Sequence, residues 1–153
     1  ESFPAGDFLD REGRAVGRHR GAIRYTLGQR KGLGLSMGEP VYVCGKDMSA
    51  NTVTVGPESA LFVREILVED LNWIAIEGLD SPLRVGAKTR SRQAEQAAEI
   101  FPESGGQVRV VFDRPQRAVT PGQAAVFYSG DAVVGGGTIV EAGTEKEKSR
   151  RKL

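Results

Sequence analysis

One basic segment of the sequence combines residue types that suit phosphate binding. Between Gly13 and Gly38 the chain has no acid and six cations, which are Arg14, Arg18, Arg20, Arg24, Arg30 and Lys31. Cations on a short glycine-rich segment repel one another, and a polyanion relieves this repulsion when its phosphates give up their counterions. The segment therefore predicts contact with a nucleic-acid backbone, and a solvated basic loop is the alternative.

The chain has one histidine, His19, which lies within this segment. An imidazole can act as a general base when a nucleophile or a paired carboxylate stands beside it. No second histidine or pair of carboxylates lies near His19 in the sequence, so a catalytic constellation is not supported. We expect a structural or RNA-contacting histidine and assign no catalytic residue.

Three polar residues, Gln29, Arg30 and Lys31, stand between glycines in the run Gly28–Gly34. Glycine lets the backbone turn sharply, so we expect Gln29 and Arg30 to be presented on one side. The two glycines at the end of the run lack the third glycine and the strand–helix unit of a dinucleotide-binding fingerprint. This excludes a nucleotide site of that kind.

A second group of cations falls on even-numbered positions, which are Arg84, Lys88, Arg90 and Arg92. Residues at alternate positions of a strand share one face, so a strand from Arg84 to Arg92 would carry all four together. Contact with an RNA backbone would explain such a strip, and ordinary exposure to solvent is the alternative.

The tetrapeptide Thr120–Gln123 has proline second and glycine third, which is typical of a type II turn. Gln123 would then project from the start of the next strand, where its amide can bond a base or remain a surface group. The one cysteine, Cys44, has no histidine or cation beside it, and we expect a small buried apolar side chain and not a nucleophile.

The composition limits the class of protein. Of 153 residues, 39% are hydrophobic and 27% charged, a balance typical of a folded protein. The 20 glycines and 7 prolines separate short apolar runs, which favours an all-β fold. The net charge of +1 leaves any attraction to nucleic acid to local clusters. A single cysteine excludes an internal disulfide and a cysteine-based zinc site, and we expect a cytoplasmic protein without a metal site, signal peptide or membrane span.

The pattern predicts a small β domain over residues 1–60 and a β-barrel over residues 61–142, followed by a disordered charged tail over residues 143–153. A hairpin is expected at Ser129-Gly130, and the run Gly135–Gly137 predicts a bulge or a close approach of another backbone. Expected strands include Ala22 to Leu27, Pro40 to Cys44, Thr52 to Val55, Arg84 to Arg92 and Gln107 to Asp113.

Several of these motifs, in this order, resemble the bacterial tRNA-specific 2-thiouridylases. The run Tyr25–Gly34, with Thr-Leu-Gly-Gln-Arg-Lys-Gly-Leu-Gly at its centre, is the most specific, and it resembles the central domain of that family. Lys88-Thr89-Arg90, the turn Thr120–Gln123 and the run Gly135–Gly137 resemble the family's C-terminal domain. The resemblance extends from about residue 3 to about residue 140.

The resemblance implies a fold and a parent activity. The C-terminal barrel would resemble the second domain of translation elongation factors. The parent enzyme would be a transferase that activates C2 of the wobble uridine of tRNA with ATP and then receives sulfur from a sulfur-relay protein on a catalytic cysteine. The ATP-binding loop and both catalytic cysteines of that family have no counterpart here, so the chain alone is expected to be inactive and to need an N-terminal catalytic domain. Members have also been called methyltransferases, but no residues here resemble a methyl-donor site.

The resemblance also implies which residues contact tRNA near the anticodon stem. The family positions correspond to Arg90, Ser91 and Gln123. Comparable members have tyrosine where Ser91 stands, and serine cannot stack on a base, so a hydrogen bond would have to replace that contact. Further RNA contacts are expected at His19, Arg20, Gln29, Arg30 and Lys31.

Two other functions remain open at this point. The chain could be a β module that docks a sulfur carrier or the catalytic domain through its sheet edges. It could also be a self-contained enzyme that uses His19, although no set of acid, base and nucleophile supports this. Salt-dependent binding of tRNA would separate an RNA-binding module from a docking module.

Overall fold

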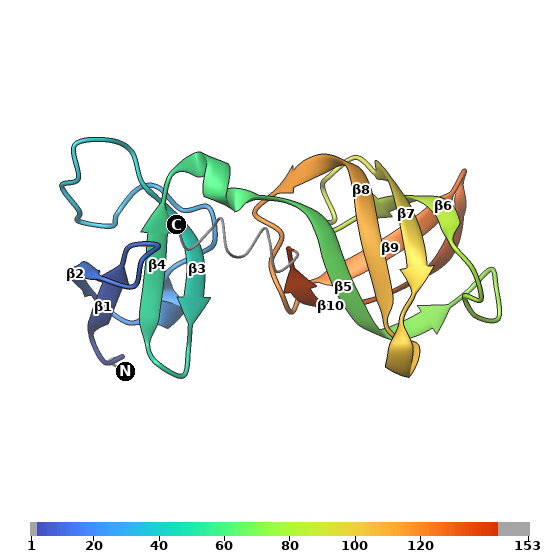
Figure 1. The fold of residues 1–153 in the computed structure, drawn as a ribbon, viewed down its shortest axis with the longest axis horizontal. Coiled ribbons are helices and arrows are strands. Elements are labelled where there is room, and N and C mark those ends of the chain that lie inside the picture. Colours follow the sequence, from blue (N-terminus) through green and yellow to red (C-terminus); the bar gives the residue numbers. More distant parts are fainter. Residues whose placement is uncertain (1–2, 144–153) are drawn as a thin grey trace. The chain divides into compact units, whose positions relative to one another are not determined.

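The computed structural model describes residues 3–143, which form two separate β units of residues 3–62 and 63–143 (Figure 1). Every regular element in this range is a strand or a short 3-10 turn, which confirms the all-β prediction. The predicted tail lies outside the described residues from position 144 onward.

The first unit is a four-stranded mixed sheet in the order β2-β1-β4-β3. Strand β1 pairs antiparallel with β2 and parallel with β4, and β4 pairs antiparallel with β3. Its buried core contains Phe8, Val43 and Val53, which lie on three different strands. The bounds of its elements are β1 Gly6–Leu9, β2 Ala15–His19, η1 Ala22–Arg24, β3 Tyr42–Asp47, β4 Thr52–Gly56 and η2 Glu58–Leu61.

The predicted strand from Ala22 to Leu27 is wrong. Gly21 has a φ of 120°, and a single 3-10 turn, η1, follows it. The chain then runs as an irregular loop to β3. The loop is attached to β3 because the Gly28 N–H donates to the Val43 carbonyl at 2.8 Å and the Val43 N–H donates to the Gln29 carbonyl at 2.9 Å. The Gly-rich run therefore lies beside the sheet and is not part of a strand.

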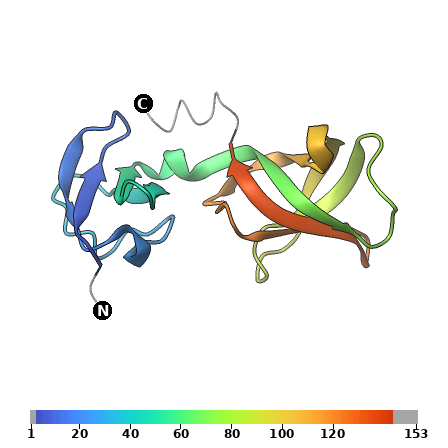
Figure 2. The same cartoon turned by 90° about the horizontal axis from the view of Figure 1, so that it is seen from below.

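The second unit is a closed barrel in the order β10-β5-β8-β7-β6-β9 (Figures 1 and 2). Strand β10 pairs antiparallel with β5 and β9, β6 pairs antiparallel with β9 and β7, and β7 pairs antiparallel with β8. The strands are β5 Phe62–Trp73, β6 Leu83–Lys88, β7 Gln96–Pro102, β8 Val108–Arg117, β9 Ala124–Ser129 and β10 Ala132–Ala142, with η3 Ser104–Gly106 between β7 and β8.

Apolar side chains at alternate strand positions fill the barrel interior, as the sequence predicts. Val108, Val110 and Phe112 of β8 are all buried, while the residues between them face outward. The predicted hairpin at Ser129-Gly130 joins β9 and β10. The strand predicted to run to Arg92 is too long, because β6 ends at Lys88.

Three consecutive glycines in β10 allow neighbouring strands to approach closely. A Cβ on Gly136 would lie 2.6 Å from the Ala125 carbonyl oxygen of β9, and one on Gly137 would lie 2.4 Å from the Glu69 carbonyl oxygen of β5. The register of β10 against β5 shifts at this point. These contacts confirm the prediction of a bulge and of close backbone contact, and they show how β10 fits between its two neighbours.

Candidate nucleic-acid interface

Two polar turns that are far apart in the sequence meet at one end of the barrel. Lys88, the last residue of β6, pairs with Val126 of the antiparallel strand β9. The residues that follow Lys88 therefore lie beside the residues that precede Val126. This register brings the turn of Arg90 and Ser91 to the end of the barrel that carries Gln123.

A hydrogen bond joins the Arg90 turn to the segment that leads into the Gln123 turn. The Nη2 of Arg90 donates to the Ala118 carbonyl at 2.7 Å and lies 3.5 Å from the Arg117 carbonyl. Ala118 is fully buried and has a φ of 54°, a conformation that L residues rarely adopt. The residue with this unusual backbone conformation is thus the one whose carbonyl accepts the hydrogen bond of Arg90.

The second turn has the geometry that its sequence predicts. The Gln123 N–H donates to the Thr120 carbonyl at 3.2 Å, and Gly122 has a φ of 94° at the third position. The Gln123 carbonyl accepts the Ile139 N–H at 2.9 Å, so the backbone at this point belongs to the barrel wall. Gln123 and Ser91 are both exposed.

A buried polar network, which the sequence analysis did not identify, supports the Arg90 turn from inside. The Gln93 Oε1 accepts both the N–H and the hydroxyl of Thr89 at 3.1 Å, and the Gln93 Nε2 donates to the Gln116 Oε1 at 3.0 Å. Thr89 and Gln116 are each 5% exposed. The burial of Gln116 could have been predicted from the sequence, because it lies an even number of positions after Val108, Val110 and Phe112 and so falls on the buried side of β8.

The four cations of the predicted strip do not act as one face. Arg84 makes a bidentate pair with Asp113, at 2.9 and 2.6 Å, and this hydrogen bonding lowers the pKa of the Asp113 carboxyl and raises that of Arg84. The Lys88 ammonium lies 5.3 Å from the centre of the Tyr128 ring. Arg90 and Arg92 follow the end of the strand. The prediction of a shared strand face is therefore wrong for these two arginines.

In the first unit, acids that precede the basic segment neutralise part of it. Arg18 pairs with Asp7 at 2.8 Å, and Arg14 pairs with Asp10 and Glu12. Backbone hydrogen bonding from Arg14 lowers the pKa of the Asp10 carboxyl. Within residues 3–143 no ion pair involves the four remaining cations, which are Arg20, Arg24, Arg30 and Lys31.

His19 is a structural residue of the first unit. Its side chain is 2% exposed, and its Nδ1 accepts the Gly21 N–H at 2.9 Å. Because Nδ1 accepts, Nε2 carries the proton and donates to the Asn51 carbonyl at 2.8 Å. The Asn51 side chain accepts the Ala22 N–H and donates to the carbonyls of residues 4 and 5. With both ring nitrogens bonded inside the unit, His19 has none left for RNA, and the structural alternative of the sequence analysis is the one the contacts favour.

Gln29 also bonds within its own loop. Its Oε1 accepts the Thr26 N–H at 3.0 Å, and its Nε2 donates to the Lys31 carbonyl at 2.9 Å. Both polar atoms of the amide are thereby engaged, whereas the side chains of Arg30 and Lys31 are exposed. The amide holds the turn that carries these two cations, which gives Gln29 a positioning role.

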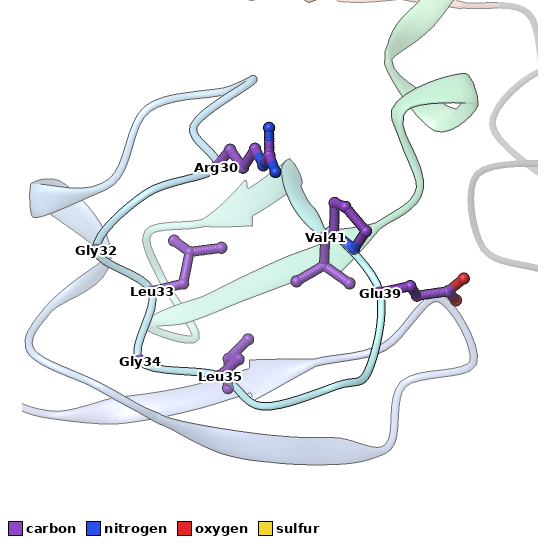
Figure 3. A pocket seen from close by; sticks show the side chains of 8 residues that line it. Arg30, Gly32, Leu33, Gly34, Leu35, Glu39 and Val41 are labelled. Atoms are coloured by element: carbon purple, nitrogen blue, oxygen red, sulfur yellow. The ribbon is translucent and has the colours of Figure 1, made fainter.

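A small hollow of about 220 Å³ lies behind Arg30. Figure 3 shows the side chains of Leu33, Leu35 and Val41 directed toward one another across it, with Arg30 at one edge and Glu39 extending away. Leu33 is buried in the core of the sheet. The apolar lining serves to attach the loop to the sheet, and it leaves the Arg30 guanidinium at the rim.

Comparisons with known proteins identify the family. Residues 63–139 match the aminomethyltransferase beta-barrel domain, and residues 2–57 match the tRNA methyl transferase PRC-barrel domain. The tRNA-specific 2-thiouridylase MnmA of Acetivibrio thermocellus is 54% identical over 88% of this chain and 37% of its own length. Those of Heliobacterium modesticaldum and Halothermothrix orenii are 52% and 45% identical over 90% and 92% of this chain. The chain belongs to the tRNA-specific 2-thiouridylase family.

The 2-thiouridylase relatives are much longer than the stretch they share with this chain. The chain spans between 36% and 40% of their length, and it corresponds to their C-terminal part. Within residues 3–143, no group of three or more His, Cys, Asp or Glu side chains could hold a metal ion. In the same residues, no helix is long and apolar enough to cross a membrane.

Proposed function

We propose that the chain is the tRNA-binding part of an ATP-dependent 2-thiouridylase that places sulfur on C2 of the wobble uridine. The observation that carries this proposal is the meeting of the Arg90-Ser91 turn and Gln123 at one barrel end, although more than 30 positions separate them in the sequence. The identity of the relatives as tRNA-specific 2-thiouridylases supports tRNA as the ligand.

The chemistry of each residue suggests its task. Arg90 offers a guanidinium that is already held in place and can bond a phosphate with its remaining N–H groups. Gln123 offers an uncharged amide that can bond a sugar hydroxyl or a base edge near the anticodon stem. Ser91 adds a hydroxyl in the same turn. On the other unit, Arg20, Arg30 and Lys31 are exposed and add positive charge for the same backbone.

We place the sulfur chemistry outside this chain. The sequence contains no Ser-Gly-Gly-Val-Asp-Ser loop for ATP, and its one cysteine, Cys44, is 4% exposed within the first unit. In this proposal an N-terminal domain supplies the ATP site and both catalytic cysteines, and a cytoplasmic sulfur-relay protein delivers the persulfide. The chain contributes the tRNA-binding surface.

Filter binding of tRNA over a series of salt concentrations tests the proposal. Arg90→Ala should weaken binding by roughly 1–2 kcal/mol and reduce the slope of log affinity against log salt by about 0.7–0.9, because one phosphate contact is lost. Gln123→Ala should weaken binding without changing the slope, since it removes no charge. Arg90→Lys serves as the matched variant, which keeps the charge and should keep most of the slope.

Because Arg90 also bonds the Ala118 carbonyl, the fold of each variant has to be checked. Trp73 is the chain's one tryptophan and lies in the barrel, so its fluorescence follows unfolding of that unit. If folded Arg90→Ala and Gln123→Ala both bind tRNA like the parent at every salt concentration, the proposal fails, and the docking-module hypothesis takes its place.

A further inference from the structure

The barrel end that carries Arg90 also contains a hollow of about 330 Å³, which is lined by Arg90, Arg92, Gln93 and Arg117. Two of the arginines belong to the turn after β6, and Arg117 is the last residue of β8. No carboxylate lines the hollow. Three guanidinium groups around one cavity produce a positive potential that an anion would neutralise.

Arg90 and Arg92 differ from Arg84 and Arg109 of the barrel in their electrostatic partners. Arg84 pairs with Asp113, and Arg109 pairs with Glu65 and Glu103. In the part of the chain that the structure describes, no ion pair involves Arg90 or Arg92. Uncompensated cations that lie together are unfavourable in the free protein, and they suit a ligand that brings its own negative charge.

The protein fixes the hollow in place. Arg90 is held by the Ala118 carbonyl at 2.7 Å, and the positive φ of the buried residue Ala118 is a strained conformation of the kind that clusters at binding sites. Beneath it, the buried chain of hydrogen bonds from Thr89 through Gln93 to Gln116 ties the turn to β8. Arg90 and the turn are thus ordered before a ligand arrives, which lowers the entropic cost of binding.

We propose that Arg90, Arg92 and Arg117 together form a binding site for one phosphodiester group of the RNA backbone. Arg92 and Arg117 thereby become RNA contacts in addition to Arg90, Ser91 and Gln123. The inference rests on the proposed function, because it assigns the phosphate to a tRNA. Each guanidinium presents N–H groups in a planar fork that matches two phosphate oxygens, which makes arginine better suited to this task than lysine.

The test is tRNA binding by the full chain across a salt series, with Arg92→Ala and Arg117→Ala. Each variant should bind about five- to tenfold more weakly at low salt and should lower the salt slope by about 0.7–0.9, as the loss of one phosphate contact requires. The matched control is Arg114→Ala, which removes an exposed arginine from the same strand, outside this hollow. It should change the slope by clearly less.

Conservative variants show whether a loss of binding comes from the lost contact or from a loss of the fold. Arg92→Lys and Arg117→Lys keep the charge, so their slopes should stay close to that of the parent while affinity falls moderately, because an ammonium lacks the planar fork. Trp73 fluorescence should report the same unfolding midpoint for all five variants. The substituted side chains of Arg92, Arg114 and Arg117 are exposed, so we expect an intact barrel.

The outcomes separate this inference from the proposed function. If Arg90→Ala and Gln123→Ala weaken tRNA binding but Arg92→Ala and Arg117→Ala behave like Arg114→Ala, the three-arginine site is refuted and the proposed function stands. If none of these variants matters, both are refuted. A parallel titration with inorganic phosphate separates the sources of the anion. Binding of inorganic phosphate without any effect of Arg92 or Arg117 on tRNA would indicate a small-anion site and overturn the proposal.

Discussion

Replacing His19 by alanine tests whether this residue holds the first unit together or touches RNA. The change removes two hydrogen bonds, to the Gly21 N–H at 2.9 Å and to the Asn51 carbonyl at 2.8 Å, and leaves both partners unsatisfied in a largely buried place. Each loss costs about 1–3 kcal/mol. The ring also makes edge contacts with Phe8 and Tyr25 at 5.4 and 5.5 Å, and their loss adds about 0.5–1.5 kcal/mol. The total is about 2.5–7.5 kcal/mol, against a net stability of about 3–9 kcal/mol for a unit of this size.

Hydrogen exchange followed by mass spectrometry can measure this loss unit by unit. His19→Ala should abolish the protection of β1 and β4 and leave the protection of β8 and β9 in the barrel unchanged. Arg20→Ala is the matched control, because Arg20 is the exposed neighbour and its loss should leave every strand protected. The structural role of His19 is refuted if His19→Ala keeps full protection in the first unit and loses tRNA binding.

Other outcomes follow from the contacts described above. Gly137→Ala should destabilise the barrel by roughly 1–3 kcal/mol, because the new methyl would overlap a carbonyl, whereas Gly78→Ala, which meets no atom within 4 Å, should be neutral by the same Trp73 fluorescence assay. The pKa of Asp113 is lowered by its hydrogen bonds with Arg84. Its small stabilising contribution should be present above the ordinary pKa of an aspartate and vanish as pH falls through the lowered value, so that Asp113→Asn reduces stability at neutral pH but not in strong acid. The purified chain should neither thiolate tRNA nor hydrolyse ATP, and turnover by a contamination-controlled sample would contradict this.

The sequence predicts the barrel well where buried and outward-facing residues alternate, as they do in β8. A period of two residues was enough to predict the buried side of β8, which carries Val108, Val110 and Phe112. The glycine run of β10 likewise predicted the close backbone contact. The wrong strand at Ala22 to Leu27 has a different cause. Ala22 and Tyr25 are buried by a turn and a loop that fold onto the sheet, and periodicity cannot distinguish that arrangement from a strand.

The candidate site was predictable only in part, because partners distant in sequence decide which polar groups remain free. Arg18 is paired with Asp7, and the Gln29 amide is used within its own loop, so both have fewer free N–H groups to offer a ligand. No local pattern contains this information. The place of Arg117 in the hollow depends on the end of β8 reaching the turn after β6, which is a property of the closed barrel.

The attachment of the glycine-rich loop to β3 also bears on self-association. A closed barrel has no open strand, but the sheet of the first unit ends in β2 on one side and β3 on the other. At Val43 the outward-facing N–H and carbonyl of β3 are occupied by Gln29 and Gly28. An unoccupied edge is a template for another chain, and such pairing leads to aggregation. The loop that carries Arg30 therefore also covers the edge of β3 at Val43. A chain in which the loop detached from β3 would be prone to pair through this strand with a second copy.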